Sequence, residues 1–185
     1  MGRSWMPARV RFPAIALAFS GYRGAGKTTL SRLCAAYLSC GFVSFGDWVR
    51  KTADARGLSH DLATLQKIGT ELASRPRQFC LDVLSQASEW TRGSTIVIDG
   101  VRHCAVRDVL PALVKPTILA NVFVDPPDKL REERLRARND PFPELYTNDP
   151  NEYDLQDLKE TADVVVTHTG SIDEIIAFME SIPHV

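Results

Sequence analysis

The sequence lacks the features that mark several classes of protein. It has four cysteines, but none forms a CxxC pair and none has a histidine partner at zinc-binding spacing. The formal net charge is -1, and no basic stripe with interleaved aromatic residues indicates nucleic-acid binding. No apolar run is long enough to cross a bilayer. We therefore expect a cytoplasmic protein with reduced cysteines and with neither a nucleic-acid nor a membrane partner.

Basic residues also precede the first apolar run, Ala14–Phe19. A secretory signal begins in a similar way, but this run leads directly into a glycine-rich loop, and cleavage here would remove the support of that loop. We interpret the run as a buried first strand. At 185 residues, the chain fits one compact domain. The predicted organisation is a basic arm over residues 1–12 and a single domain over residues 13–185.

Short β-branched or apolar runs alternate with helical patterns along the whole chain. This alternation predicts a parallel sheet with helices on both faces. The expected strands are Ala14–Ser20, Gly41–Phe45, Thr95–Ile98, Ile118–Val124 and Asp163–Thr167.

The segment Gly21–Thr28 fits the phosphate-loop pattern G-x-x-x-x-G-K-[ST] at every fixed position. Such a loop surrounds phosphates with backbone N–H groups, and the helix that follows adds its positive dipole end. Lys27 is expected to reach the β- and γ-phosphates, and the Thr28 hydroxyl to contact Mg²⁺. The pattern predicts binding of ATP with Mg²⁺. The expected nucleotide-binding residues are Gly21, Arg23, Gly24, Ala25, Gly26, Lys27, Thr28 and Thr29.

The run Ser94–Asp99 is rich in β-branched residues and ends in an aspartate. In phosphate-loop proteins an aspartate at the end of a neighbouring strand holds the magnesium ion or its waters. We therefore expect Asp99 to share the ion with Thr28. The alternative is an ordinary turn formed by Asp99 and Gly100.

Two further segments resemble parts of adenylate kinases. Ser44–Arg50 is similar to their Ser-Thr-Gly-Asp-x-Leu-Arg segment, and Ile98–Arg102 is similar to their Asp-Gly-x-Pro-Arg segment, one residue shorter and without the proline. The resemblance implies that Arg50 and Arg102 hold the phosphate of the acceptor, with Asp47 beside them. Two cations that converge on one dianion would also hold the acceptor in line with the γ-phosphate.

A third segment, Glu133–Arg138, carries Arg134 and Arg138 four residues apart on one helical face. It resembles the Arg-x-x-x-Arg pair at the start of the lid of nucleotide kinases. The resemblance implies that both arginines act in catalysis together with Lys27 and Asp99. A solvated charged helix is the alternative. Residues 139–159 are rich in Pro, Asn, Asp and Glu, and we expect them to form a short lid.

The order of these segments resembles that of the P-loop nucleotide kinase superfamily. Within it, the nearest resemblance is to a poorly characterised archaeal family related to dephospho-CoA kinases, through Arg56-Gly57-Leu58, Ala162-Asp163 and Gly170-Ser171. The resemblance implies a five-stranded parallel sheet of order 2-3-1-4-5 and an acceptor-binding helical region over residues 46–90. It also implies transfer of the γ-phosphoryl group of ATP to a small phosphorylated acceptor, a nucleoside monophosphate.

Two alternatives to this function stay open at the level of sequence. Residues 139–159 contain no arginine, although the lid of adenylate kinases supplies several, and this leaves room for another acceptor. If the acceptor is a hydroxyl group, as in dephospho-CoA kinase, then Asp47 or Asp99 would accept its proton. The other alternative is a slow ATPase that senses nucleotide and has no acceptor.

Overall fold

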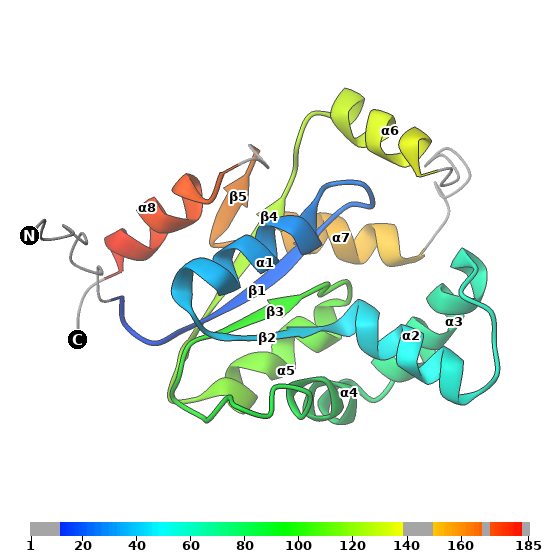
Figure 1. The fold of residues 1–185 in the computed structure, drawn as a ribbon, viewed down its shortest axis with the longest axis horizontal. Coiled ribbons are helices and arrows are strands. Elements are labelled where there is room, and N and C mark those ends of the chain that lie inside the picture. The colour runs from blue at the N-terminus through cyan, green and yellow to red at the C-terminus, as the bar shows by residue number, and fades with distance from the viewer. Residues whose placement is uncertain (1–11, 139–149, 168–170, 183–185) are drawn as a thin grey trace, which may run out of the picture.

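The computed structural model describes residues 12–138, 150–167 and 171–182 (Figure 1). Its five strands form one parallel sheet in the order β2-β3-β1-β4-β5, which confirms the predicted order. The strands are β1 (Ile15–Gly21), β2 (Gly41–Ser44), β3 (Ile96–Asp99), β4 (Ile118–Val124) and β5 (Val164–Val166). The described helices are α1 (Lys27–Leu38), α2 (Phe45–Ala55), α3 (Leu62–Ala73), α4 (Pro76–Leu84), α5 (Cys104–Val114), α6 (Asp128–Ala137), α7 (Pro150–Glu160) and α8 (Asp173–Ser181). None of these helices is long and apolar enough to cross a membrane.

The central strand β1 is buried along its whole length and supplies side chains to both faces of the sheet. Ile15, Leu17 and Phe19 belong to the core cluster that α1 and α8 cover. Ala16 and Ala18 belong to the other cluster, which α2, α4, α5 and α7 cover. Successive residues of a strand point to opposite faces. This explains why the run reads as continuously apolar rather than alternating.

The carboxyl ends of β1, β2 and β3 meet at one edge of the sheet. Asp99 at the end of β3 is in register with Phe19 of β1 and with Ser44 of β2. The chain leaves β1 through α1 towards β2 at one edge, while β4 lies on the other side of β1 (Figure 1). Ligands of open α/β sheets bind at such a reversal of strand order. We therefore expect a ligand to bind at this edge of the sheet.

The region between β2 and β3 contains α2, α3 and α4. Ser44 caps α2 by accepting a hydrogen bond of 3.2 Å from the Asp47 backbone N–H. Asp61 caps α3 in the same way, through a 2.9 Å bond from the Thr64 N–H. Pro76 occupies the first turn of α4, where a missing N–H has no cost. Local capping chemistry thus divides the region into three helices, of which α2 and α3 extend beyond the edge of the sheet (Figure 1).

The expected lid, residues 139–159, differs from the structure in its second part. Residues 150–160 form α7, which packs against the sheet and α5 through Leu155 and Leu158, 5% and 2% exposed. The three-residue spacing places both leucines on one helical face. This part is therefore core helix rather than lid. Residues 139–149 lie outside the described residues, and a lid there stays a prediction.

We expect Leu158→Ala to lower the free energy of unfolding by about 2–5 kcal/mol, because it removes a fully buried side chain from the contact between α7 and the sheet. The measurement is urea unfolding followed by circular dichroism. Leu81→Ala, at a residue of α4 that is 40% exposed, is the matched control and should cost about 1 kcal/mol or less. Equal costs for the two variants would contradict the packing of α7.

Candidate functional site

The loop between β1 and α1 depends on glycine at the positions that the motif fixes. Gly21 has φ 139° and Gly26 has φ 92°, a region that other residues rarely adopt. A Cβ atom on Gly21 would lie 2.4 Å from the backbone oxygen of Val124 in β4, which has no room to move. The first glycine is therefore required by the neighbouring strand as well as by the turn itself.

Lys27 lies within this loop and is 9% exposed. Its Nζ donates hydrogen bonds of 2.7 Å to the backbone oxygens of both Gly21 and Tyr22. The pKa of Lys27 is lowered from 10.5 to about 7, chiefly by burial and next by the nearby Arg102, although Asp99 acts in the opposite direction. The ammonium group is thus poorly stabilised among other cations. An anion bound here would raise that pKa again, because opposite charge favours the protonated form.

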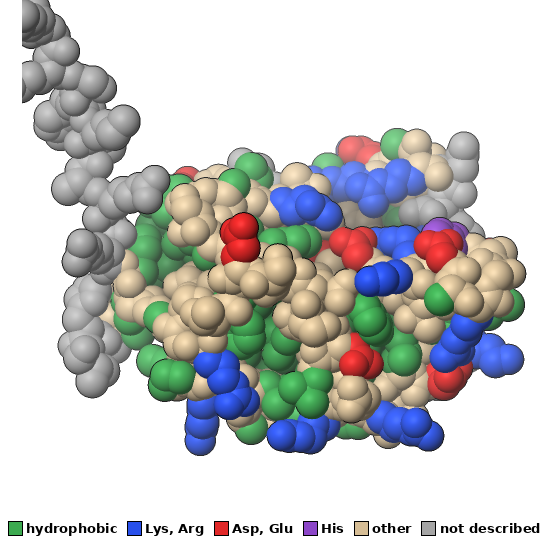
Figure 2. Space-filling view, turned by 60° about the horizontal axis from the view of Figure 1, so that its bottom comes forward, with side chains coloured by type: hydrophobic (Ala, Val, Ile, Leu, Met, Phe, Trp, Pro, Cys, Tyr) green, Lys and Arg blue, Asp and Glu red, His purple; other side chains and the backbone are tan. Residues whose placement is uncertain are grey.

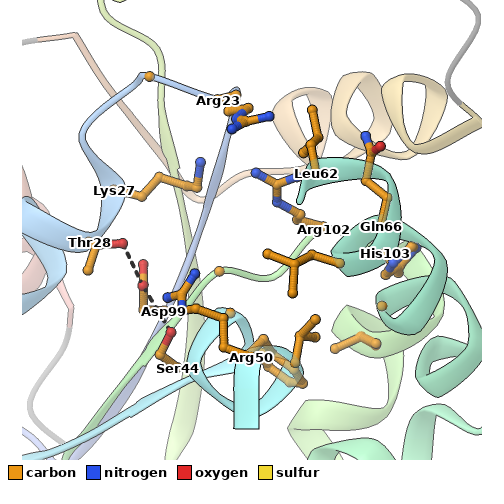
Figure 3. Close-up of a pocket in the computed structure, with 18 of the residues that line it drawn as sticks. Arg23, Lys27, Thr28, Ser44, Arg50, Leu62, Gln66, Asp99, Arg102 and His103 are labelled. Atoms are coloured by element: carbon orange, nitrogen blue, oxygen red, sulfur yellow. Dashed lines mark hydrogen bonds between the residues drawn. The ribbon is translucent and has the colours of Figure 1, made fainter. Parts of the chain in front are cut away.

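Asp99 is 3% exposed and meets two hydroxyl groups at the carboxyl edge of the sheet. Its Oδ2 accepts bonds from Thr28 Oγ1 at 2.8 Å and from Ser44 Oγ at 3.3 Å (Figure 3). Its Oδ1 is buried and accepts no hydrogen bond from the described residues. A buried carboxylate oxygen that accepts no hydrogen bond is energetically unfavourable unless a cation binds to it.

This donor set fits Mg²⁺. The ion prefers hard oxygen ligands and is held in proteins by one or two carboxylates together with substrate phosphates. Asp99 and the Thr28 hydroxyl supply such ligands side by side. Within the described parts of the chain no three His, Cys, Asp or Glu residues cluster as a metal cage would require. The chemistry therefore suits an ion that a phosphate ligand completes.

A cavity of about 360 Å³ opens from the loop between the sheet edge and helices α2 to α5 (Figure 3). One end holds Lys27, Thr28 and Asp99, and the opposite end holds Gln66 and His103. The residues that line it are Arg23, Gly24, Gly26, Lys27, Thr28, Thr29, Ser44, Phe45, Gly46, Val49, Arg50, Leu62, Leu65, Gln66, Gly69, Phe79, Asp99, Gly100, Arg102, His103, Val106 and Arg138.

Most of the charged side chains that line the cavity are basic. Among the described residues it includes Lys27 and four arginines, but a single carboxylate, that of Asp99. In the space-filling view, basic side chains lie along the hollow at the upper right, and acidic side chains also lie on its rim (Figure 2). A wall with this excess of cations concentrates anions and attracts them from a distance. The cavity is therefore built for ligands that carry several negative charges.

Asp47 and Arg50 occupy different surroundings, although they are neighbours on α2. Arg50 lines the cavity, and its Nη2 lies 2.6 Å from Asp47 Oδ1. The Asp47 carboxylate is 51% exposed, lies 3.6 Å from Arg32 and does not line the cavity. Arg102 lines the middle of the cavity, between Lys27 and the far end (Figure 3). The structure thus brings Arg50 and Arg102 to one cavity and leaves the Asp47 side chain outside it.

Helix α6 packs directly on the phosphate loop. Arg134 Nη1 donates a bond of 2.9 Å to the backbone oxygen of Ala25, and Arg131 Nε donates one of 3.3 Å to that of Arg23. The pair expected from the sequence is therefore divided, because Arg138 lines the cavity while Arg134 contacts loop carbonyls. The arginine-bearing helix supports the loop from outside.

The sequence reading missed three residues of the site. Ser44 was detectable, because a serine three residues before Asp47 at the start of a helix is a capping pattern. Arg131 follows the helical spacing of Arg134, three residues away. His103 carries no local signal, and only the packing of α5 against α7 and the cavity places it.

Comparisons with known proteins agree with this architecture. A family model described as "AAA domain" matches residues 20–144. A UPF0200 protein of Methanothrix thermoacetophila is 31% identical over 129 residues, which cover 67% of each chain. These matches confirm the resemblance to P-loop nucleotide kinases.

Solved structures with the same fold include two kinases. The Mycobacterium tuberculosis APS kinase in complex with AMPPNP and APS is 19% identical, with a TM-score of 0.55 over 92% of this chain and 100% of that one. An Acinetobacter baumannii shikimate kinase in complex with shikimate is 19% identical, with a TM-score of 0.52 over 90% of this chain and 89% of that one. At this identity the likeness establishes the fold.

We expect Gly21→Ala to weaken binding of a non-hydrolysable ATP analogue by about 100-fold, because the new Cβ displaces the loop from Val124. Gly57→Ala is the control. Gly57 also has a positive φ, of 65°, but its Cβ would meet nothing within 4 Å. It should cost about 1–2 kcal/mol of stability and leave affinity unchanged. Titration calorimetry and thermal unfolding measure both, and unaltered affinity in Gly21→Ala would contradict the loop's role.

Proposed function

Because the chain belongs to the AAA-domain family of P-loop proteins, we propose that it transfers the γ-phosphoryl group of ATP to a small phosphorylated acceptor, a nucleoside monophosphate. The observation that carries this proposal is the charge of the cavity. Five cationic side chains face a single carboxylate among the described lining residues. A single triphosphate bound at the loop would not need the additional cations of Arg50 on α2 and Arg102 after β3. Two phosphate-bearing ligands would make use of all five cations.

The donor end combines the phosphate loop with the metal ligands. The loop N–H groups and the start of α1 bind the phosphates, and Lys27 turns from its own loop carbonyls to the β- and γ-phosphates. Thr28 and Asp99 hold Mg²⁺, which neutralises charge on the phosphates when it is bound. Arg138 adds a cation from the end of α6, and Arg134 keeps the loop in place through Ala25.

The acceptor end begins at Arg102 and Arg50. A phosphate held between these two guanidinium groups lies in the same cavity as the donor end. One of its oxygens attacks the γ-phosphorus, the bond from that phosphorus to the β-γ bridging oxygen breaks, and ADP leaves with the electron pair. The products are ADP and a nucleoside diphosphate. Arg50 exchanges Asp47 for the acceptor, which competes for the same guanidinium.

The position of Asp47 favours a phosphate acceptor over a hydroxyl. A hydroxyl acceptor requires a base within hydrogen-bond reach, whereas a phosphate oxygen is already ionised. Asp47 is exposed, bound to arginine and absent from the lining of the cavity. Asp99 accepts bonds from Thr28 and Ser44 and is proposed to hold the metal. Neither carboxylate is thus placed to accept a proton.

The test is release of ADP from Mg-ATP with and without each member of a panel of nucleoside monophosphates, deoxynucleotides and dephospho-CoA. We expect one nucleoside monophosphate to stimulate release strongly. Arg102→Ala should lower kcat/KM for it by roughly 10- to 100-fold, the value of a charged hydrogen bond to phosphate. Arg50→Ala should act in the same direction.

Two controls accompany this assay. Lys27→Ala supplies the blank, and Arg77→Ala, at an exposed arginine of α4 away from the cavity, should behave as the unmodified protein. Slow ADP release that no acceptor changes would reject the proposal and favour a nucleotide sensor. Stimulation by dephospho-CoA alone would move the reaction to a hydroxyl acceptor.

Asp47→Asn separates the two acceptor chemistries directly. If the acceptor is a phosphate, we expect kcat to change by no more than about fivefold, because only an exposed ion pair is lost. Loss of a general base would instead lower kcat by roughly 100- to 10,000-fold. Steady-state kinetics with the best acceptor distinguish these results, and Asp54→Asn, an exposed carboxylate near the end of the same helix, is the matched control.

A further inference from the structure

The side chain of Tyr22, the second residue of the phosphate loop, contacts three other elements of the structure. Its ring lies edge-on against Phe123 of β4, with the ring centroids 5.4 Å apart and the ring planes at 81°. The guanidinium carbon of Arg131 in α6 lies 4.6 Å from the centroid of the same ring. The Tyr22 hydroxyl donates a hydrogen bond of 3.3 Å to Gln156 Oε1 in α7. One loop side chain is therefore held by the sheet and by two helices.

Arg131 contacts the phosphate loop at two successive residues. Besides covering the Tyr22 ring, it donates a hydrogen bond of 3.3 Å from Nε to the backbone oxygen of Arg23. Its Nη1 donates one of 2.7 Å to Asp128 Oδ1 in the first turn of α6, and its side chain is 14% exposed. The bond to Asp128 keeps the guanidinium over the ring, whose face attracts a cation. A single side chain of α6 thus holds two neighbouring residues of the loop.

These contacts orient the peptide units of the loop. A trans peptide is planar, and its C=O and N–H groups point in opposite directions. Because the Arg23 carbonyl accepts a bond from α6, the N–H of Gly24 points away from that helix. The Tyr22 carbonyl accepts bonds from Lys27 Nζ at 2.7 Å and from the Ala25 N–H at 3.3 Å. The ring contacts and the bond to α6 therefore fix the backbone of a loop that binds phosphate through its N–H groups.

We propose that Tyr22 and Arg131 are positioning residues that hold the phosphate loop in its ligand-binding form before a nucleotide binds. This inference rests on the nucleotide-binding part of the proposed function and is independent of the acceptor. A loop that already has its bound geometry loses less conformational freedom on binding, and its affinity is higher for that reason. The two side chains act through the backbone of residues 22–24 and contact no phosphate themselves.

Direct contact with the nucleotide is the alternative role for an aromatic ring and an arginine, because both stack on bases. The two roles affect different parts of the ligand. Inorganic tripolyphosphate resembles the phosphates of ATP but has neither base nor ribose. Loop positioning predicts the same loss of affinity for Mg-tripolyphosphate as for the Mg²⁺ complex of a non-hydrolysable ATP analogue. A base contact would affect the analogue alone.

The experiment measures the affinity of the full chain for both ligands by titration calorimetry. We expect Tyr22→Leu and Arg131→Gln each to weaken the binding of both ligands by roughly 10-fold, because each change removes the cation–π contact that holds the loop. Tyr22→Leu leaves the net charge unchanged, so its effect does not arise from weaker attraction of anions. Tyr22→Phe keeps the ring and should bind both ligands within about threefold of the unmodified protein. The double variant should lose roughly 10-fold rather than 100-fold, because both side chains act on the same peptide units.

Matched variants separate loop positioning from a general loss of stability. Tyr37→Leu makes the same change at a tyrosine of α1 that is 52% exposed. Arg136→Gln makes the same change at a side chain of α6 that is 67% exposed. Both should bind the two ligands like the unmodified protein, and thermal unfolding verifies that every variant is folded at the temperature of the titration. If Tyr22→Leu does not fold, Arg131→Gln and the comparison of the two ligands still decide the matter.

Each outcome bears on the proposal. Affinities that stay within threefold in both Tyr22→Leu and Arg131→Gln would overturn it. A loss confined to the ATP analogue would also overturn it, in favour of a base contact. If the unmodified protein binds neither ligand, the nucleotide-binding part of the proposed function fails, and loop positioning fails with it. Failure of every acceptor in the ADP-release assay would instead reject the kinase reaction and leave loop positioning standing, because the titration needs no acceptor.

Discussion

The burial of Lys27 beside other cations is the constraint on which the rest of the site depends. Its ammonium group is desolvated, lies close to Arg102 and donates to the backbone oxygens of Gly21 and Tyr22, and its pKa is lowered to about 7. Arg134 and Arg131 likewise donate to loop carbonyls. The carbonyls of the phosphate loop thus stabilise cations from two sides. A polyanionic ligand would be stabilised by these cations, which the fold already holds in position.

This arrangement links the two ends of the cavity. The donor end needs the loop, and the loop is held between Val124 of β4 on one side and α6 on the other, where Leu135 is 1% exposed. The acceptor end is formed by α2 and α3, which extend from the sheet, and by the start of α5. Arg102 lies between the two ends because Gly100, with φ 84°, turns the chain immediately after β3. One short segment after β3 therefore supplies both the metal ligand and the central arginine.

Helix α7 packs against the core and also contacts His103 at the far end of the cavity. Leu155 and Leu158 bury one face of it against the sheet, and Asp154, one residue earlier, contacts His103. The same helix thus places a carboxylate beside the His103 ring.

The sequence by itself determined the fold class, the order of the strands and the phosphate loop, because local patterns carry them. A glycine-rich loop between a buried strand and a helix, and a β-branched strand that ends in Asp99, are readable without a structure. Tertiary structure decided which way side chains point and what they meet. It turned Asp47 outwards to Arg50 and Arg32, divided Arg134 from Arg138, and converted half of the expected lid into α7. It also placed Gln66 of α3 and His103 before α5 in the lining of one cavity, and Asp154 of α7 beside His103. Such contacts depend on long-range packing, which no local spacing encodes.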